Sequence, residues 1–214
     1  MSAPRPLLPT LAAVVATLGV AFAAAAHLTL GFRAFTAEDA RRIRVAESPV
    51  VLSPVEVVDA AGRTRTLWNA DPAARAWLVT FVYTRCPSAC LALGTEFQQL
   101  QRSVLATGKD PHVRFASVSF DRAHDTSAEL ARYAARFRAD PALWSVAVPA
   151  TDAALAKLLA ETGVVVIGDG LGGYAHNAAI HVVTPSGKLV AIFDLERYQD
   201  ALAFAQALPK PGAT

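Results

Sequence analysis

The sequence predicts an α/β fold, in which a mixed β-sheet is flanked by helices and preceded by an N-terminal transmembrane or signal segment. Residues 11–30 are almost entirely apolar, and residues 77–82 form a continuous β-branched and aromatic run. From there to the C-terminus, strand-like and helix-like patterns alternate. The continuous run is typical of a strand buried on both faces, and the alternation is typical of helices packed on a sheet.

Length and composition indicate one folded domain. The 214 residues carry a formal net charge of +2, and 53% of them are hydrophobic. These values exclude the disordered and the nucleic-acid-binding classes, so we predict no nucleic-acid partner. Even without a targeting segment, the chain is long enough to bury a good-sized core.

Residues 1–32 contain one basic residue, Arg5, and no acidic residue. About 20 apolar residues span a bilayer as a helix, so this segment can be an uncleaved signal anchor with Arg5 on the cytoplasmic side. It can also be a cleaved signal peptide, because the three alanines 24–26 resemble a cleavage site. The length of the apolar stretch favours the anchor, whereas the basic segment 41–44 on its far side weakens the argument on orientation.

Both alternatives export the rest of the chain to a compartment in which disulfides persist. We predict an inner-membrane protein with a single N-terminal span and its domain in the periplasm, or a periplasmic protein if the signal is cleaved. The predicted division of the chain comprises the segment 1–32, a linker 33–49, a domain 50–208 and a tail 209–214.

The first half of the domain is predicted to contain a hairpin, a central strand and a long helix. Turn residues 59–63 separate two β-rich stretches, residues 50–58 and 64–68. After the central strand, the apolar positions are spaced four, three and four apart, which predicts an amphipathic helix that ends near Gly108.

The second half of the domain is predicted to alternate strands with helices. Thr126 and Glu129 have the spacing of a capping box and predict a helix start, Thr151 predicts another, and residues 198–208 form the closing helix. The glycine-rich residues 168–173 lack the spacing of a phosphate-binding loop, and we interpret them as a mobile loop. The predicted strands are residues 112–120, 144–148, 164–167, 178–183 and 189–193.

This order of elements is the thioredoxin-like layout with an added N-terminal hairpin. In such sheets, ligand sites lie outside the carboxyl ends of strands. The loop that contains the cysteines and the polar loop at Asp121 both follow predicted strands.

The only cysteines, Cys86 and Cys90, lie four positions apart where the central strand gives way to the helix. A helix N-terminus favours a thiolate, and the neighbouring Arg85 is expected to lower a thiolate pKa further. Two such thiolates can form a disulfide or bind a soft metal such as Cu(I). Apolar filler cysteines and a structural disulfide are the alternatives, and the clustering favours the functional interpretation.

A copper site with two cysteines needs a third donor, for which histidine is the usual residue. His112 begins a strand, and His181 lies inside an apolar strand, so a structural role is expected for both. His124 lies in the Asp121 loop and is a candidate ligand. His176 follows the glycine-rich segment and can approach a metal as that segment moves, which favours it slightly over His124.

Three elements, in the same order, resemble the Sco/SenC family. Residues 82–90 resemble its aromatic-Thr-x-Cys-Pro-x-x-Cys signature, and residues 119–126 resemble its Ser-x-Asp-Pro-x-Arg-Asp-Thr loop. Residues 176–187 resemble its histidine and Pro-x-Gly element. The likeness extends from about residue 50 to residue 208, and the N-terminal anchor fits it.

The resemblance implies a membrane-tethered copper chaperone that binds Cu(I), Cu(II) or both through Cys86, Cys90 and His176. Such proteins load the binuclear copper site of a cytochrome c oxidase subunit, or reduce the cysteines of that site. The resemblance also implies that Asp121 tunes the site electrostatically. A metallochaperone of this kind is not an enzyme.

The alternative function is enzymatic. Cys86 and Cys90 would then act as a thiol-disulfide oxidoreductase on exported proteins, without an obligate metal. A thiol peroxidase is a third, weaker alternative, for which the sequence has no dedicated motif.

The sequence departs from the family pattern at several positions near the proposed ligands. These departures leave the three ligands in place, keep the redox alternative open and do not identify the client oxidase. They are Leu91 after the second cysteine, Arg122 for proline and His124 for arginine in the loop, and the apolar Ala175 before His176.

Overall fold

The computed structural model describes residues 7–68, 74–86, 89–107 and 112–209, and the chain divides into two compact units, Met1–Arg44 and Val45–Thr214. Helix α1 (Leu7–Leu28) belongs to the first unit and has no buried residue. With a rise of about 1.5 Å per residue, its 22 residues extend over about 33 Å, enough for a hydrocarbon core of about 30 Å. Length and composition therefore suit a membrane span, and a signal sequence would share both properties.

Helix α2 (Ala37–Glu47) occupies most of the predicted linker. It begins with a reciprocal capping box, in which Thr36 Oγ1 accepts a hydrogen bond from Asp39 N, and Asp39 Oδ2 accepts one from Thr36 N. The segment between the apolar helix and the domain is thus helical over these residues.

The second unit is built on a mixed eight-stranded sheet with the order β1-β10-β9-β4-β5-β6-β2-β3. The three neighbouring strands β4, β5 and β6 run parallel, and the other pairings are antiparallel. The strands are β1 (Val50–Val51), β2 (Glu56–Asp59), β3 (Thr64–Thr66), β4 (Ala76–Val82), β5 (Val113–Ser119), β6 (Trp144–Pro149), β9 (Ile180–Val183) and β10 (Lys188–Phe193).

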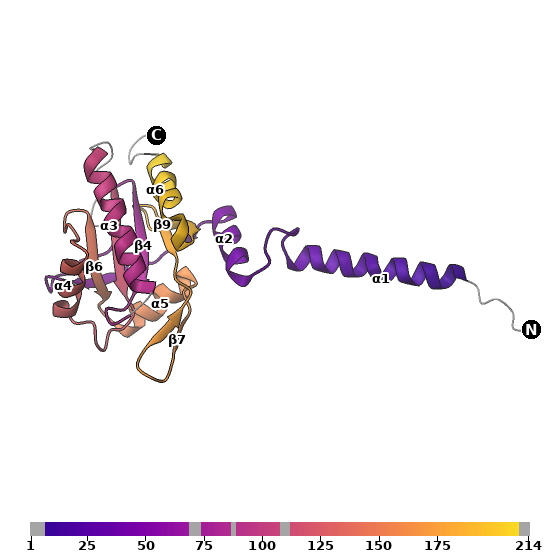
Figure 1. Ribbon diagram of the computed structural model, residues 1–214, viewed down its shortest axis with the longest axis horizontal. Coiled ribbons are helices and arrows are strands. Elements are labelled where there is room, and N and C mark those ends of the chain that lie inside the picture. Colours follow the sequence, from indigo (N-terminus) through magenta and orange to yellow (C-terminus); the bar gives the residue numbers. More distant parts are fainter. Residues whose placement is uncertain (1–6, 69–73, 87–88, 108–111, 210–214) are drawn as a thin grey trace, which may run out of the picture. The chain divides into compact units, whose positions relative to one another are not determined.

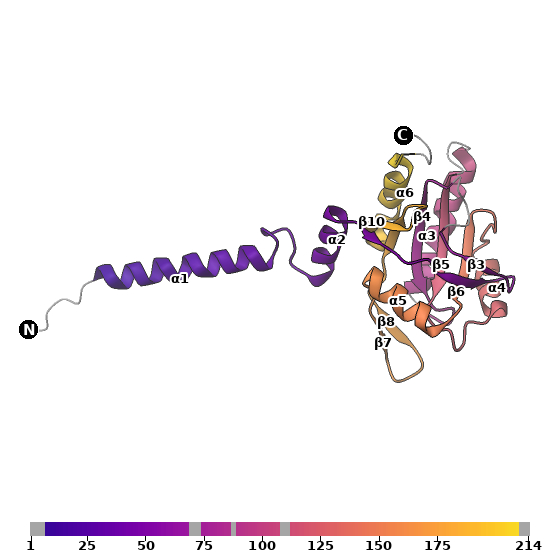
Figure 2. The same ribbon diagram turned by 180° about the vertical axis from the view of Figure 1, so that it is seen from behind.

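Helices cover both faces of this sheet. Helices α3 (Ala89–Thr107) and α4 (Ser127–Arg136) connect parallel strands and lie on one face. Helix α6 (Tyr198–Ala207), preceded by the short helix η1 (Leu195–Arg197), lies on the same face (Figure 1). Helix α5 (Asp152–Thr162) lies on the opposite face (Figure 2).

The core lies between the sheet and these helices. Every residue of β4 is buried, as expected for its continuous apolar sequence. On one side of the sheet, the Phe97 ring of α3 packs edge-on against Phe115 and Trp144, with centroid distances of 5.4 and 5.5 Å. This packing fixes the helix that carries the second cysteine to β5 and β6.

Most predicted elements are confirmed, including their caps. Thr126 accepts a hydrogen bond from Glu129 N at the start of α4, and Thr151 accepts one from Ala154 N at the start of α5. Gly163 ends α5 in the left-handed conformation, with φ of 69°. The predicted glycine stop of α3, Gly108, lies outside the described residues, and α3 extends to Thr107.

The prediction of one strand over residues 50–58 is wrong. Strand β1 pairs with β10 at one end of the sheet, whereas β2 pairs with β6 and β3 towards the other end. Pro54 lies between them and has no N–H to donate to a ladder. Ser53 donates its backbone N–H and its hydroxyl to the Glu161 carboxylate instead, at 2.8 and 2.6 Å. The predicted hairpin is therefore limited to β2 and β3.

The interpretation of residues 168–173 as a loop also needs correction. They form the tip of a hairpin between β7 (Val166–Gly168) and β8 (Tyr174–His176), which make a separate two-stranded antiparallel sheet. The Asp169 carboxylate accepts hydrogen bonds from Leu171 N and Gly173 N, at 2.7 and 2.8 Å. His176 is thus the last residue of a strand and not part of a free loop.

Helices α3 and α4 approach closely at Gly94. A Cβ atom at this position would lie 2.4 Å from the Phe137 ring. The substitution Gly94→Ala should lower the free energy of unfolding by about 1–2 kcal/mol, because overpacking outweighs the gain of about 1 kcal/mol in helix propensity. Urea denaturation of the domain measures this, with the exposed Thr95→Ala as a control that changes it by less than about 0.5 kcal/mol. A stabilised Gly94→Ala variant would contradict the close packing.

Candidate metal centre

The two loops singled out in the sequence meet at one edge of the sheet. Strands β4 and β5 are parallel and paired along their length, with Val82 opposite Ser119 at their carboxyl ends. The chain continues from Val82 into the cysteine turn and from Ser119 into the Asp121 loop. The prediction that both loops lie at this edge is confirmed.

The cysteine turn places a helix amide on one of the sulfurs. Cys86 N donates to Tyr83 O at 3.1 Å, which closes the turn. Cys90 is the second residue of α3, and its backbone N–H donates to Cys86 Sγ at 3.4 Å. Neither Cys86 nor Cys90 is part of a disulfide, and both are buried. The predicted contact between a sulfur and the helix N-terminus is therefore present, and it is made by Cys86.

The histidine favoured from the sequence lies beside the second cysteine. His176 Nε2 is 4.0 Å from Cys90 Sγ. Bonds of about 2.0 Å to nitrogen and about 2.3 Å to sulfur, the lengths known for zinc, put two ligands of one metal roughly 3.7–4.3 Å apart at angles of 120–180°. The observed separation is compatible with one metal ion between these two atoms.

The three proposed ligands do not form a complete preorganised cluster. Within the described residues, no group of three or more His, Cys, Asp and Glu side chains is close enough to hold a metal ion. The structure brings His176 to the sulfur of Cys90, and Cys86 to the backbone of Cys90. Enclosing one ion with all three would require these side chains to move.

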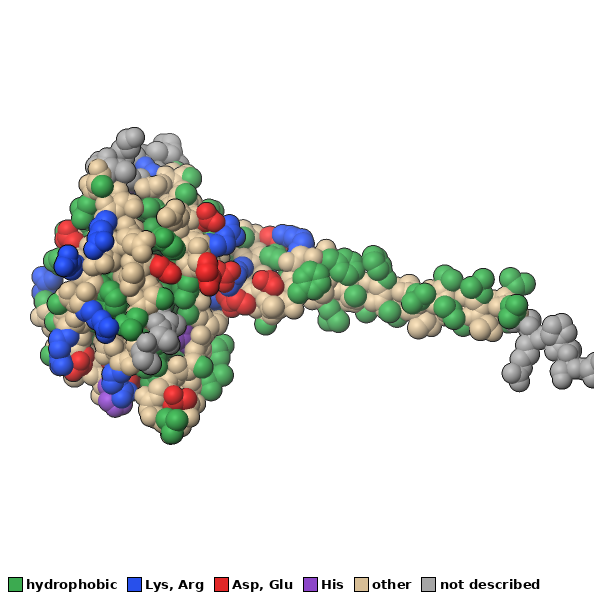
Figure 3. Space-filling model, in the orientation of Figure 1, with side chains coloured by type: hydrophobic (Ala, Val, Ile, Leu, Met, Phe, Trp, Pro, Cys, Tyr) green, Lys and Arg blue, Asp and Glu red, His purple; other side chains and the backbone are tan. Residues whose placement is uncertain are grey.

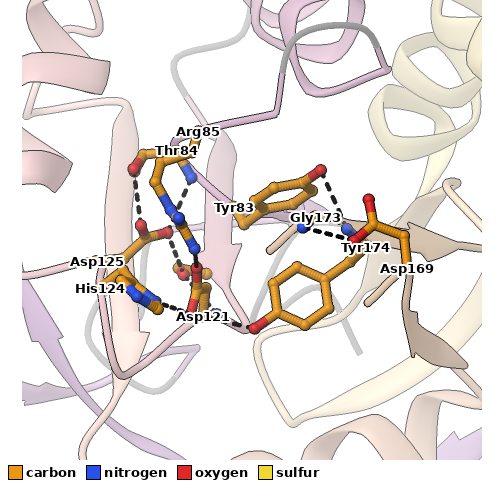
Figure 4. A network of polar contacts seen from close by, with 10 residues as sticks. Tyr83, Thr84, Arg85, Asp121, His124, Asp125, Asp169, Gly173 and Tyr174 are labelled. Carbon is orange, nitrogen blue, oxygen red and sulfur yellow. Dashed lines mark hydrogen bonds and ion pairs between the residues drawn. The ribbon is translucent and has the colours of Figure 1, made fainter. Parts of the chain in front are cut away.

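His176 is positioned by aromatic rings. The Phe120 ring lies edge-on to its imidazole, with 5.1 Å between the centroids. Tyr174, two residues earlier on β8, packs against Tyr83 and Phe120 at 5.2 and 5.5 Å, and its backbone N–H donates to the Tyr83 hydroxyl at 3.3 Å (Figure 4). These contacts join the hairpin to the residues that follow β4 and β5.

The second ring nitrogen of His176 makes no hydrogen bond to the described residues. His176 Nδ1 is buried and has no hydrogen-bond partner in the described part of the chain. Burial lowers the pKa of His176, which favours the neutral imidazole that binds metals. Metal-binding histidines usually donate this other nitrogen to a carboxylate or a carbonyl. Here the ring depends on its aromatic neighbours for orientation.

A buried carboxylate holds the start of the cysteine turn. Asp125 accepts hydrogen bonds from Thr84 N, Thr84 Oγ1 and Ser119 Oγ, at 2.9, 2.7 and 2.6 Å (Figure 4). Ser119 ends β5 and Thr84 follows β4. One side chain therefore ties the cysteine turn to the neighbouring loop.

Asp121 forms a second buried anchor. Its carboxylate accepts from Arg85 at 2.8 Å and pairs with His124 Nδ1 at 2.9 Å, and the Tyr174 hydroxyl donates to it at 3.5 Å. Burial alone would raise the pKa of Asp121, but the hydrogen bonds from Arg85 and His124 outweigh burial and lower it. His124, the alternative histidine, is thus engaged with this carboxylate.

The expectation that Arg85 lowers the thiolate pKa is wrong for Cys90. The guanidinium group of Arg85 pairs with Asp121, so its charge is largely balanced. Burial is the main cause that raises the pKa of Cys90 well above its ordinary value, and its hydrogen bond with Cys86 acts in the same direction. In the reduced, metal-free protein, Cys90 is a protonated thiol at neutral pH.

The remaining histidines lie as the sequence indicated. His181 is fully buried in β9, where its Nδ1 donates to Val79 O at 3.3 Å and its ring lies edge-on to Phe81. His112 precedes β5 and is partly exposed.

The residues that sequence reasoning missed are Tyr83, Phe120 and Tyr174, and the only available signal was their position next to the cysteine turn, the Asp121 loop and His176.

The fold and this edge of the sheet define a thioredoxin-like protein with a paired-cysteine site, as predicted. Residues 45–207 match the family model described as SCO1/SenC. The chain belongs to the SCO1/SenC family. A search of curated proteins found no match.

Solved structures of similar fold include several Sco proteins. A SCO1/SenC family lipoprotein from Bacillus anthracis str. Ames aligns with a TM-score of 0.66 and 18% identity, over 75% of this chain and 97% of that chain. Bradyrhizobium japonicum ScoI with copper bound aligns with a TM-score of 0.60 and 24% identity, over 74% and 99%. BsSco aligns with a TM-score of 0.61 and 17% identity, over 75% of this chain and 96% of that chain. It is a member of the Sco family of cytochrome c oxidase assembly proteins in which a disulfide switch has been identified. At these identities the likeness establishes the fold.

Replacing the carboxylate of Asp125 should loosen the cysteine turn. In Asp125→Asn, the side-chain NH2 group replaces a carboxylate oxygen that accepts hydrogen bonds, so a donor faces the donors of Thr84 or Ser119. A buried polar group left without a hydrogen-bond partner costs about 1–3 kcal/mol. Urea denaturation should show that the free energy of unfolding of Asp125→Asn is lower than that of the wild type by about 1–3 kcal/mol. The control Asp200→Asn removes an exposed carboxylate paired with Arg197 and should cost less than about 1 kcal/mol. Equal effects of the two substitutions would refute the anchoring role of Asp125.

The raised pKa of Cys90 predicts slow alkylation. A raised pKa means that a smaller fraction of Cys90 is thiolate at pH 7. In the reduced, metal-free protein, Cys90 should therefore react with iodoacetamide at pH 7 more slowly than a cysteine in an unfolded peptide, whose pKa is about 8.5. Mass spectrometry of timed digests gives the rate for each cysteine, and denatured protein supplies the reference rate. Rapid modification of Cys90 in the folded protein would contradict its burial as a thiol.

Proposed function

We propose that this protein is an exported, membrane-tethered copper chaperone that holds copper through Cys86, Cys90 and His176. Its client would be the binuclear copper site of a cytochrome c oxidase subunit, to which it delivers copper or whose cysteines it reduces. The observation that carries the proposal is the 4.0 Å separation of His176 Nε2 and Cys90 Sγ, two groups 86 positions apart in the chain.

The chemistry of the three side chains suits copper. Thiolates favour Cu(I), and imidazole accommodates both Cu(I) and Cu(II). The copper-bound state of Bradyrhizobium japonicum ScoI, a protein of the same fold, supports the assignment. Copper is the cargo in this proposal, so the site must release the ion as well as bind it.

The position of His176 suits release. His176 ends a two-stranded hairpin that is separate from the main sheet, and its Nδ1 has no hydrogen-bond partner among the described residues. The two cysteines, in contrast, belong to the buried turn and the first turn of α3. We infer that His176 is the ligand that leaves first when copper passes to the client.

Membrane tethering rests on α1. This helix is long and apolar enough to span a bilayer, and a lipoprotein with the same fold is known from Bacillus anthracis. We propose an inner-membrane location with the domain in the periplasm, or a soluble periplasmic domain if the segment is cleaved. Either arrangement gives the domain access to an exported copper site.

The ligand set can be tested by titrating the reduced domain with Cu(I) against a competing chelator. The wild-type domain should bind about one copper per chain, and His176→Ala should weaken binding by at least about 100-fold, since loss of a second-shell partner alone costs 10–100-fold. His124→Ala is the matched control, because His124 is held by Asp121, and it should bind copper like the wild type. Undiminished affinity in His176→Ala would reject the assignment.

The second candidate function is thiol-disulfide exchange on exported proteins. Cys86 and Cys90 are both in the thiol state, and the backbone N–H of Cys90 donates to the sulfur of Cys86. The disulfide switch described for BsSco supports this candidate. If a His176→Ala strain loses oxidase assembly while the purified variant keeps its exchange rate with a disulfide substrate, exchange alone cannot be the function.

A further inference from the structure

The surface beside the cysteine turn is unusually rich in exposed cations. Among the described residues from 84 to 138, all four carboxylates are buried or half-buried, whereas five guanidinium groups are exposed. Figure 3 shows basic side chains gathered over the part of the domain that contains α3 and α4. The carboxylates are Glu96, Asp121, Asp125 and Glu129, and the exposed arginines are Arg85, Arg102, Arg132, Arg136 and Arg138.

A cavity of about 150 Å³ opens in this surface between the cysteine turn and α4. Three of its four charged lining residues are arginines. The cavity, which we call the arginine pocket, is lined by Thr84, Arg85, Glu129, Arg132, Tyr133 and Arg136.

The guanidinium groups of the arginine pocket are available to a new partner. Arg136 has no carboxylate within ion-pair distance in the described part of the chain, and its guanidinium lies 5.8 Å from the Phe137 ring. Arg132 and Arg85 are paired with Glu129 and Asp121 and remain exposed. The Arg132–Glu129 pair lies at the surface, where such pairs contribute at most about 1 kcal/mol, so a carboxylate from another molecule can replace Glu129 at little cost. Asp121 is buried, so Arg85 keeps that partner and offers its exposed side to a new carboxylate.

The arginine pocket is built from the same segments as the cysteine site. Thr84 and Arg85 immediately precede Cys86. On the α4 side, the Tyr133 hydroxyl donates to Cys90 O at 3.4 Å. A ligand in the pocket therefore contacts the chain next to one cysteine, and a side chain bonded to the other.

We propose that the arginine pocket is the docking site for an acidic side chain of the protein that exchanges metal or electrons with Cys86 and Cys90. A carboxylate matches the planar fork of a guanidinium. The exposed arginines extend beyond the pocket, so they also attract an acidic protein surface at long range and accelerate its approach. This inference rests on the proposed function, and it identifies the chemistry of the partner's surface.

Arg85 connects the arginine pocket to the metal ligands. Its guanidinium pairs with the buried Asp121, which also accepts from the Tyr174 hydroxyl. Tyr174 lies two residues before His176 on β8. A partner carboxylate on the exposed side of Arg85 therefore lies at the end of a chain of hydrogen bonds that leads to the His176 hairpin.

The test measures binding of an acidic peptide to the reduced full-length protein in detergent. The probe is a labelled peptide of alternating Glu and Gly, and its Gln–Gly counterpart is the uncharged control. The variant is R132Q/R136Q, and the matched control is R197Q, which neutralises an exposed arginine in η1. We expect the double variant to bind the acidic peptide at least about tenfold more weakly, with R197Q unchanged and the Gln peptide not bound. Equal losses in both variants, or equal binding of both peptides, would overturn the proposal.

Two further measurements separate this inference from the proposed function. Copper stoichiometry on the same samples should be unchanged in R132Q/R136Q, so absence of copper binding in the wild type rejects the chaperone function alone. The soluble copper-site domain of the oxidase subunit from the same organism should associate more slowly with R132Q/R136Q and with increasing salt. An association rate independent of both would overturn the docking site.

Discussion

The parallel, in-register pairing of β4 and β5 is the constraint on which the site depends. Parallel strands end at the same edge of a sheet, so the turn after Val82 and the loop after Ser119 must meet. Complete burial of β4 holds this pairing, because a slip of one residue would change which face each side chain occupies. The cysteines and the Asp121 loop are neighbours as a consequence.

Two buried carboxylates convert that proximity into a defined geometry. Asp125 binds the backbone and hydroxyl of Thr84, and Asp121 binds Arg85, so both act on the residues directly before Cys86. Both carboxylates are buried, whereas five arginines between residues 84 and 138 are exposed to solvent. The arrangement supports the cysteine turn from within and leaves a cationic surface beside it.

The candidate ligands differ in how firmly they are held. The two cysteines belong to a turn and a helix of the main domain, whereas His176 belongs to a separate hairpin fastened by the rings of Tyr174 and Phe120. Unequal attachment of this kind suits a site that must give up its ion. The high pKa of Cys90 adds that, without metal or oxidation, this sulfur stays protonated.

The sequence alone determined the strand–helix order, the caps and the position of Cys86 and Cys90, because these follow from local periodicity and capping chemistry. It did not predict the separation of β1 from β2, which depends on distant partners: β10, β6 and the Glu161 carboxylate. It also did not predict that residues 168–173 form the tip of a hairpin, which depends on the pairing of β7 with β8. The balance of Arg85 by Asp121 and the burial that raises the pKa of Cys90 were also decided in three dimensions. Charge and desolvation depend on neighbours that only the folded chain brings together.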